Sequence, residues 1–166
     1  MNFLMAIIKG TPVYVWVILA LLISRAIAAS KDSPVSVRKS MLMPAIFIVW
    51  GLEKVIDGFG FPAQSLITYV ISAAAGTGLG YLLYSKTLKF EMREGVFTRL
   101  GSPVPGVVII VNFVVKYVEN VAMAVDKQLL LTLWYNITYC VISGLTVGLF
   151  IGGTLNTAAN RKQIIN

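Results

Sequence analysis

Five stretches of mostly apolar residues dominate the pattern of the chain. They run over about residues 12–29, 41–56, 62–84, 104–124 and 128–155. A helix needs about 20 predominantly apolar residues to cross the roughly 30 Å of hydrocarbon in a bilayer, and each stretch meets or nearly meets that length. The pattern therefore predicts an all-α membrane protein, in which five transmembrane helices form one bundle and one domain over residues 1–166.

The first stretch also resembles a secretory signal peptide. Ala26, Ile27 and Ala28 form a small-residue pattern of the kind that is cleaved after such a peptide. However, Arg25 stands directly before that pattern, and Lys9 is the only basic residue ahead of the apolar stretch. Both features are unusual for a signal peptide, so we interpret the stretch as an uncleaved first transmembrane helix.

The segment between the third and fourth stretches, about residues 87–100, has strand periodicity. Leu88, Phe90 and Met92 alternate with charged residues, and Glu94 and Gly95 are suited to a turn before a returning strand. We predict a short cytoplasmic β-hairpin. Because an isolated hairpin is only marginally stable in water, its apolar face needs support from the bilayer or the helix ends. It is either a simple connection or a docking surface for a soluble partner.

Composition agrees with a membrane protein. The chain is 57% hydrophobic and only 13% charged, whereas soluble domains average about 25% charged residues. The net charge of +7 would point to nucleic acid in a soluble protein. Here the apolar content makes the lipid bilayer the expected partner, and we expect no nucleic acid.

Cysteine and histidine counts restrict the chemistry. Cys140 is the only cysteine and there is no histidine. The chain therefore cannot form an internal disulfide, and it lacks the commonest general base and zinc ligand. The seven acids do not form a ligand motif. We expect no enzymatic activity, no catalytic residues, no metal site and no cofactor.

Basic residues predict the orientation, because short cytoplasmic loops are enriched in Lys and Arg. If the N-terminus lies outside and the C-terminus in the cytoplasm, the cytoplasmic side carries Arg25, Lys31, Arg38, Lys39, Lys86, Lys89, Arg93, Arg99, Arg161 and Lys162 against Asp32, Glu91 and Glu94. The outer side then has four bases and four acids. Trp16, Trp50 and Trp134 lie toward the outer helix ends, where aromatic side chains favour the interface. We predict a bacterial inner (plasma) membrane location with this topology.

Glycines recur at helical spacing in two of the predicted helices. Gly76 and Gly80 lie in the third, and Gly144, Gly148 and Gly152 lie in the fifth. Small residues four positions apart let helix backbones approach closely in lipid. They indicate either packing within the bundle, or a seam for a homo-oligomer or a narrow pore.

Charged residues within the predicted spans are the candidates for a site. Glu53 and Asp57 lie on one face of the second helix. The fourth helix carries a polar stripe that consists of Asn112, Lys116, Glu119 and Asn120. Both sets lie at a similar depth, and an ionised side chain inside a bilayer costs at least about 2.5–3.5 kcal/mol. We therefore predict that Glu53 or Asp57 lies near Lys116, and that Lys54 is available to Glu119.

Several functions are compatible with these charges. They can be a structural ion-pair cluster that fixes helix register, or a cation or proton site in a transport protein. We favour a small transporter or transport accessory with an outward-facing charged site. The alternative is a structural or assembly subunit that binds a partner, or a second copy of itself, through the glycine-rich faces.

Short motifs spread along the chain resemble a known family. They are Thr11 to Trp16 with Val17, Arg38-Lys39 and Pro44 ahead of Trp50-Gly51-Leu52, Gly101-Ser102, and Lys116-Tyr117. Together they resemble an uncharacterised family of small bacterial inner-membrane proteins with about five spans. That family has a proline before the glycine-serine pair, whereas Leu100 stands there in this chain and Pro103 follows. The resemblance implies location and fold, and no residue role.

Overall fold

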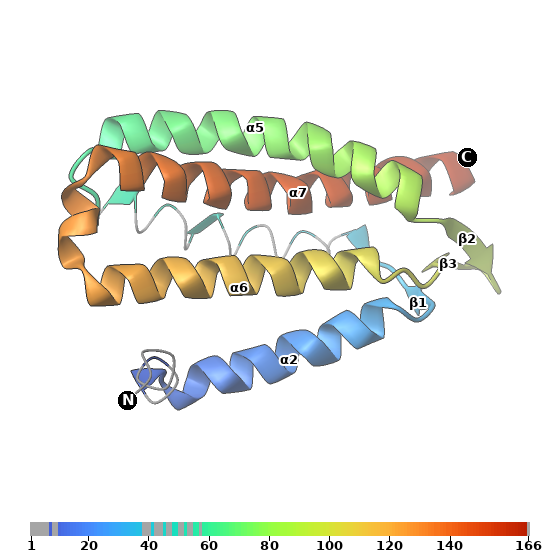
Figure 1. Ribbon diagram of the computed structural model, residues 1–166. Coiled ribbons are helices and arrows are strands. Elements are labelled where there is room, and N and C mark those ends of the chain that lie inside the picture. Colours follow the sequence, from blue (N-terminus) through green and yellow to red (C-terminus); the bar gives the residue numbers. More distant parts are fainter. Residues whose placement is uncertain are drawn as a thin grey trace.

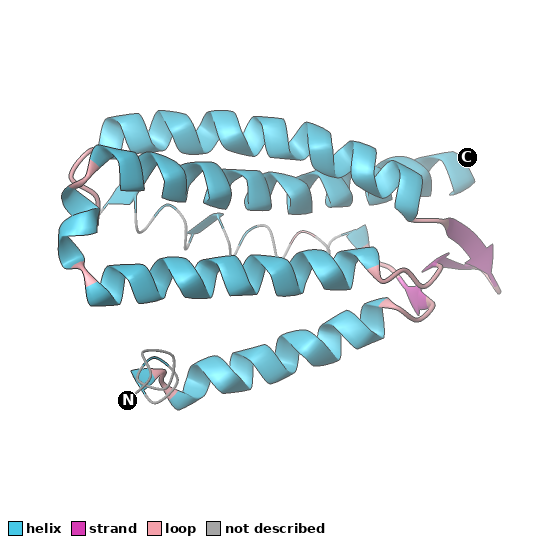
Figure 2. Cartoon of the chain, in the orientation of Figure 1, coloured by secondary structure: helices cyan, strands magenta, loops and turns pink. Residues whose placement is uncertain are grey.

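The computed structural model describes residues 10–37 and 58–165, together with residues 7, 41, 45, 48, 49, 52, 55 and 56. Within these residues the fold consists of long helices with a small sheet at one end (Figures 1 and 2). The helices are α2 (Val13–Ala29), α5 (Pro62–Thr87), α6 (Val104–Val125) and α7 (Leu133–Ile165). A 3₁₀ helix, η1 (Lys127–Leu131), joins α6 to α7. The strands are β1 (Ser33–Pro34), β2 (Phe90–Arg93) and β3 (Val96–Arg99).

Three of the predicted spans, α5, α6 and α7, are helices long and apolar enough to cross a membrane. α2 is a shorter apolar helix of 17 residues. Most of the predicted helix over 41–56 lies outside the described residues. The chain is therefore mostly helical and compatible with a membrane protein, as the apolar pattern predicts.

The predicted boundaries of the last helix are wrong at both ends. The apolar pattern predicts a helix over about 128–155, whereas α7 begins at Leu133 and ends at Ile165. Before α7, the carboxylate of Asp126 accepts a 2.9 Å hydrogen bond from the backbone N–H of Gln128 and caps η1. Beyond Leu155 the residues are polar but still compatible with a helix. Hydropathy thus marks where the apolar part ends, and not where the helix ends.

The hairpin over 87–100 is confirmed as part of a three-stranded antiparallel sheet of order β1-β3-β2. Glu94 and Gly95 have φ angles of 50° and 78°, and two left-handed residues form the type I′ turn that suits a two-residue hairpin loop. The prediction missed β1, which is two residues long and contains Pro34. Proline is confined to sheet edges, and only the pairing with β3 makes this segment a strand.

The chain after β3 packs tightly against the end of α2. The backbone N–H of Ser102 donates to the carbonyl of Ala29 at 3.1 Å, and that of Gly101 donates to the carboxylate of Asp32 at 2.8 Å. A Cβ on Gly101 would lie 2.8 Å from the carbonyl carbon of Ser30, so a larger residue does not fit. This contact places the end of α2 beside the start of α6.

The helices are packed in two pairs, α5 with α7 and α2 with α6 (Figure 1). The five glycines singled out in the sequence lie where α5 meets α7. A Cβ on Gly76 would lie 2.8 Å from the Cα of Leu145, and one on Gly148 would lie 2.6 Å from the carbonyl carbon of Gly76. Gly80, Gly144 and Gly152 make equally close approaches to the opposite helix. These glycine faces are therefore occupied by the chain's own helices.

A core of large side chains joins α5, α6 and α7 to the segment before α5. Its buried members are Val55, Phe59, Tyr69, Met123, Tyr135, Tyr139, Cys140 and Val147. The rings of Phe59 and Tyr139 meet edge to face, with centroids 5.2 Å apart. Ile48 and Leu52 pack against this core, and positions 48, 52, 55 and 59 follow helical spacing.

Candidate functional site

Lys116 and Glu119 on α6 form an ion pair within the candidate membrane span. The ammonium of Lys116 lies 3.0 Å from Oε2 of Glu119. The pair spans one helical turn, a spacing at which side chains on a helix meet. The Glu119 side chain is only 9% exposed and that of Lys116 is 23% exposed. Glu119 lies about 9 Å from the η1 end of α6 at 1.5 Å per residue, so the pair is inside the bundle and toward that end.

α7 supplies the other partners of this ion pair. Lys116 donates to the hydroxyl of Ser143, and its ammonium lies 3.8 Å from the centroid of the Tyr139 ring. The hydroxyl of Tyr135 donates to the backbone carbonyl of Glu119 at 2.9 Å. Positions 135, 139 and 143 recur every fourth residue, so one face of α7 makes all these contacts.

Further side chains with polar atoms on α7 and α5 are completely buried. Asn136 and Cys140 on α7 and Ser65 on α5 are each 0% exposed. Cys140 lies within electrostatic range of Lys116, Glu119 and Ser65. We call Lys116 and Glu119 of α6, together with Tyr135, Tyr139 and Ser143 of α7, the Lys116–Glu119 cluster.

Several buried polar atoms of α5, α6 and α7 have no hydrogen-bond partner in the described part of the chain. They include Oε1 of Glu119 in the cluster, Oδ1 of Asn112 on α6, Oγ of Ser65 on α5 and both amide atoms of Asn136 on α7. A buried polar group without a partner costs about 1–3 kcal/mol. The second oxygen of Glu119, which has no partner among the described residues, leaves this ion pair able to bind a proton, a cation or water.

The predicted site residues differ in burial and in whether the structure describes them. Asn112 is buried on α6 on the same side as Lys116 and Glu119. Asn120 is exposed, and its amide donates to the backbone carbonyl of Lys116 at 2.7 Å, so its side chain faces away from the cluster. Glu53 and Asp57, with Lys54, lie outside the described residues. Their pairing with Lys116 and Glu119 stays a prediction.

The sequence interpretation did not single out Asn136, Ser143 and Tyr139. They lie in an apolar stretch, where a single polar residue is not by itself evidence of a functional site. Their spacing does predict a shared polar face, because positions 136, 139 and 143 lie on one side of a helix. A polar face on the last helix, next to the stripe at 112, 116 and 119, would have pointed to the same cluster.

A second group of charges lies at the sheet. The guanidinium of Arg93 lies 2.7 Å from the carboxylate of Asp32 and also pairs with Glu91. The N–H of Gly101 and the charge of Arg93 hold the pKa of Asp32 below its ordinary value, and the two carboxylates raise the pKa of Arg93. Burial lowers the pKa of Arg99, which donates to the carbonyl of Ala29 at 3.3 Å. These contacts join the sheet to the end of α2.

The described residues contain no group of three His, Cys, Asp or Glu side chains placed to hold a metal ion. The acids of the Lys116–Glu119 cluster and of the sheet are separated by most of the length of α6.

The chain belongs to the family of unknown function DUF6622, whose model matches residues 1–163. This confirms the resemblance to an uncharacterised family that the short motifs indicated. No curated protein and no solved structure matches the chain.

Proposed function

We propose that this protein is a small transporter, or an accessory subunit of one, in the bacterial inner membrane, and that the Lys116–Glu119 cluster is its site for a cation or a proton. The observation that carries the proposal is the carboxylate of Glu119. One of its oxygens pairs with Lys116, while the other is buried without a partner among the described residues. Ionisable groups inside a membrane are commonly part of an ion or proton path.

The membrane placement is supported by the outward faces of the helices. Val107, Val111, Val114 and Val118 are all more than half exposed on α6, and they recur at the spacing of one helical stripe. Such a stripe is suited to face lipid. We propose that a fifth helix over 41–56 completes the bundle, because Ile48, Leu52 and Val55 pack on the core at helical spacing.

The orientation is supported by charge. The described residues at the sheet end include eight bases, namely Arg25, Lys31, Lys86, Lys89, Arg93, Arg99, Arg161 and Lys162, against Asp32, Glu91 and Glu94. The positive-inside rule assigns such an end to the cytoplasm. Trp134, 72% exposed beside η1, then lies at the outer interface. The N-terminus is outside and the C-terminus is cytoplasmic in this proposal.

The proposed cycle uses the alternative contacts of Lys116. When a proton or cation binds at Glu119, the attraction between the carboxylate and the ammonium weakens. Lys116 keeps the Ser143 hydroxyl and the face of the Tyr139 ring, so its charge is not left without contacts. Release of the bound ion restores the pair. The proposal assigns no enzymatic step and no cofactor to the chain.

A flux assay tests this proposal. The purified protein is reconstituted into liposomes that contain a dye sensitive to protons, to Na⁺ or to K⁺, and uptake of each ion is driven by an imposed membrane potential. We expect flux above that of empty liposomes, and a loss of at least about tenfold in Glu119→Gln, as expected when an essential charged contact worth about 1.4 kcal/mol or more is removed. Glu94→Gln, in the exposed hairpin turn, is the matched control. Flux equal to empty liposomes, or an unchanged flux in Glu119→Gln, contradicts the proposal.

The structural interpretation of the same charges makes a different prediction. If the pair only fixes helix register, Lys116→Met and Glu119→Gln each lower stability, by up to about 3 kcal/mol for a largely buried pair. The double variant then recovers stability, and no variant changes any flux. Thermal unfolding and flux measured on the same four proteins separate the two functions.

An assembly role through the glycine faces has less support. A second copy or another partner would have to replace the α5–α7 contact, in which all five glycines are already engaged. A homo-oligomer would instead use other surfaces.

A further inference from the structure

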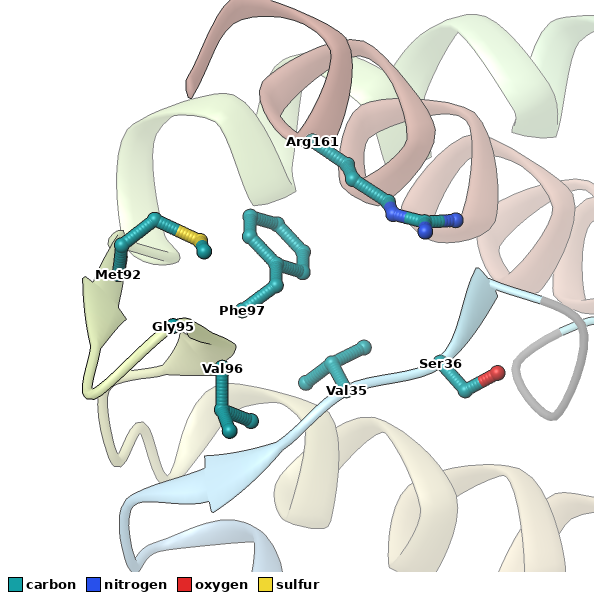
Figure 3. Close-up of a pocket in the computed structure, with 7 residues that line it drawn as sticks. All are labelled: Val35, Ser36, Met92, Gly95, Val96, Phe97 and Arg161. Carbon is teal, nitrogen blue, oxygen red and sulfur yellow. The ribbon is translucent and has the colours of Figure 1, made fainter. Parts of the chain in front are cut away.

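A pocket of about 300 Å³ lies between the sheet and the last turns of α7 (Figure 3). Val35, Met92, Val96 and Phe97 form its apolar wall, and Arg161 reaches over it from α7 (Figure 3). The Phe97 ring stacks on Phe90, with centroids 5.2 Å apart, so the wall is held in place by the hairpin. The pocket thus combines an apolar surface with one cation.

The depth of this pocket matches the headgroup layer of a bilayer. Trp134 and Arg161 lie on the same continuous helix, about 40 Å apart along its axis at 1.5 Å per residue. A bilayer is about 40–45 Å thick when both headgroup regions are included. When Trp134 lies in one interface, Arg161 and the pocket lie in the opposite one.

The charge of Arg161 is not neutralised within the described part of the chain, because no salt bridge there includes it. Two acids of the sheet, Asp32 and Glu91, are both paired with Arg93. The third, Glu94, lies in the hairpin turn and forms no salt bridge among the described residues. Arg161 thus lines the pocket without an acidic partner among the described residues, and guanidinium groups bind phosphate oxygens strongly and with two bonds.

We infer that this pocket binds the headgroup of an anionic glycerophospholipid, with the phosphate on Arg161 and the glycerol and first acyl carbons against Val35, Val96 and Phe97. An amphiphile matches a lining that is apolar on one side and cationic on the other. Its phosphate is at the correct depth, and the surplus of bases at the sheet end attracts anionic lipid. The inference is independent of transport, because it requires only that the helices span a bilayer.

Native mass spectrometry of the purified full chain in detergent tests the inference. The chain is titrated with phosphatidylglycerol and, separately, with phosphatidylcholine. Both lipids carry the phosphate, but phosphatidylcholine adds a choline cation, which Arg161 and the other bases at the sheet end repel. We therefore expect one phosphatidylglycerol to bind at least about tenfold more tightly than phosphatidylcholine. Arg161→Gln should abolish that preference. Lys162→Gln, which removes a neighbouring charge that is also exposed, should keep it.

Two further variants keep the result interpretable. Arg161→Lys retains the charge and should bind within about threefold of the original chain, since a lysine still binds phosphate but without the planar fork. Val96→Glu places a negative charge at a position that is 48% exposed on the pocket wall, and it should lower phosphatidylglycerol binding while the thermal midpoint is unchanged.

Three results would overturn the inference. The first is equal binding of the two lipids. The second is an equal loss in Arg161→Gln and Lys162→Gln, which would mean that only the total charge matters. The third is competition by glycerol 3-phosphate at the same concentration as the lipid, which would mean that the pocket binds a free phosphate and not a lipid.

Discussion

Replacement of Gly76 by alanine tests one of the close backbone contacts between α5 and α7. A Cβ at this position would lie 2.8 Å from the Cα of Leu145 and still closer to the carbonyl oxygen of that residue. The neighbouring atoms belong to a helix backbone and cannot turn aside as a side chain does. α5 and α7 must therefore separate locally, and the contacts along their seam weaken.

The size of the effect follows from two opposing contributions. Overpacking of a well-packed interior costs about 1–3 kcal/mol, and a backbone clash belongs at the upper end of that range. Alanine is also a better helix former than glycine by about 1 kcal/mol. We therefore expect Gly76→Ala to lower the free energy of unfolding by about 2 kcal/mol, the difference between these two contributions.

Gly78 is a matched control on the same helix. A Cβ at Gly78 meets nothing within 4 Å, so Gly78→Ala gains helix propensity without a clash and should be neutral or more stable by up to about 1 kcal/mol. Both variants can be unfolded in mixed detergent micelles and followed by circular dichroism. If Gly76→Ala is as stable as Gly78→Ala, the glycines do not determine the α5–α7 contact.

Two more predictions concern single hydrogen-bonding groups. The N–H of Gly101 and the charge of Arg93 hold the pKa of Asp32 below its ordinary value of 3.8. The ionised carboxylate therefore stabilises the folded chain at pH values above the pKa that Asp32 has in the unfolded chain. This stabilisation is lost as the pH falls through the lower pKa of the folded state. Asp32→Asn should therefore make stability less dependent on pH below about 4, as measured by thermal unfolding at a series of pH values, and an unchanged pH profile would contradict the assignment. Tyr135→Phe removes the 2.9 Å bond to the carbonyl of Glu119 and should cost about 1 kcal/mol, whereas Tyr14→Phe, at an exposed position, should cost nothing in the same unfolding assay.

Local patterns were sufficient for most of the elements. Long apolar stretches predicted α5 and α6 to within a few residues, because hydrophobic length is a property of neighbouring positions in the chain. The alternation around Phe90 and Met92 and the pair Glu94-Gly95 predicted the hairpin in the same way. In contrast, β1 exists only because β3 lies beside it, and two residues carry too little pattern to show that.

The sequence by itself determined that this chain is built from apolar helices, where its hairpin turns, and which polar residues are out of place in an apolar setting. Only the tertiary structure decided which faces meet. Lys116 has Glu119, Ser143 and Tyr139 around it, and the glycines of α5 and α7 engage each other. The physical reason is that periodicity places a residue on a face of its own helix, whereas the rotation and depth of the opposite helix depend on packing along its whole length.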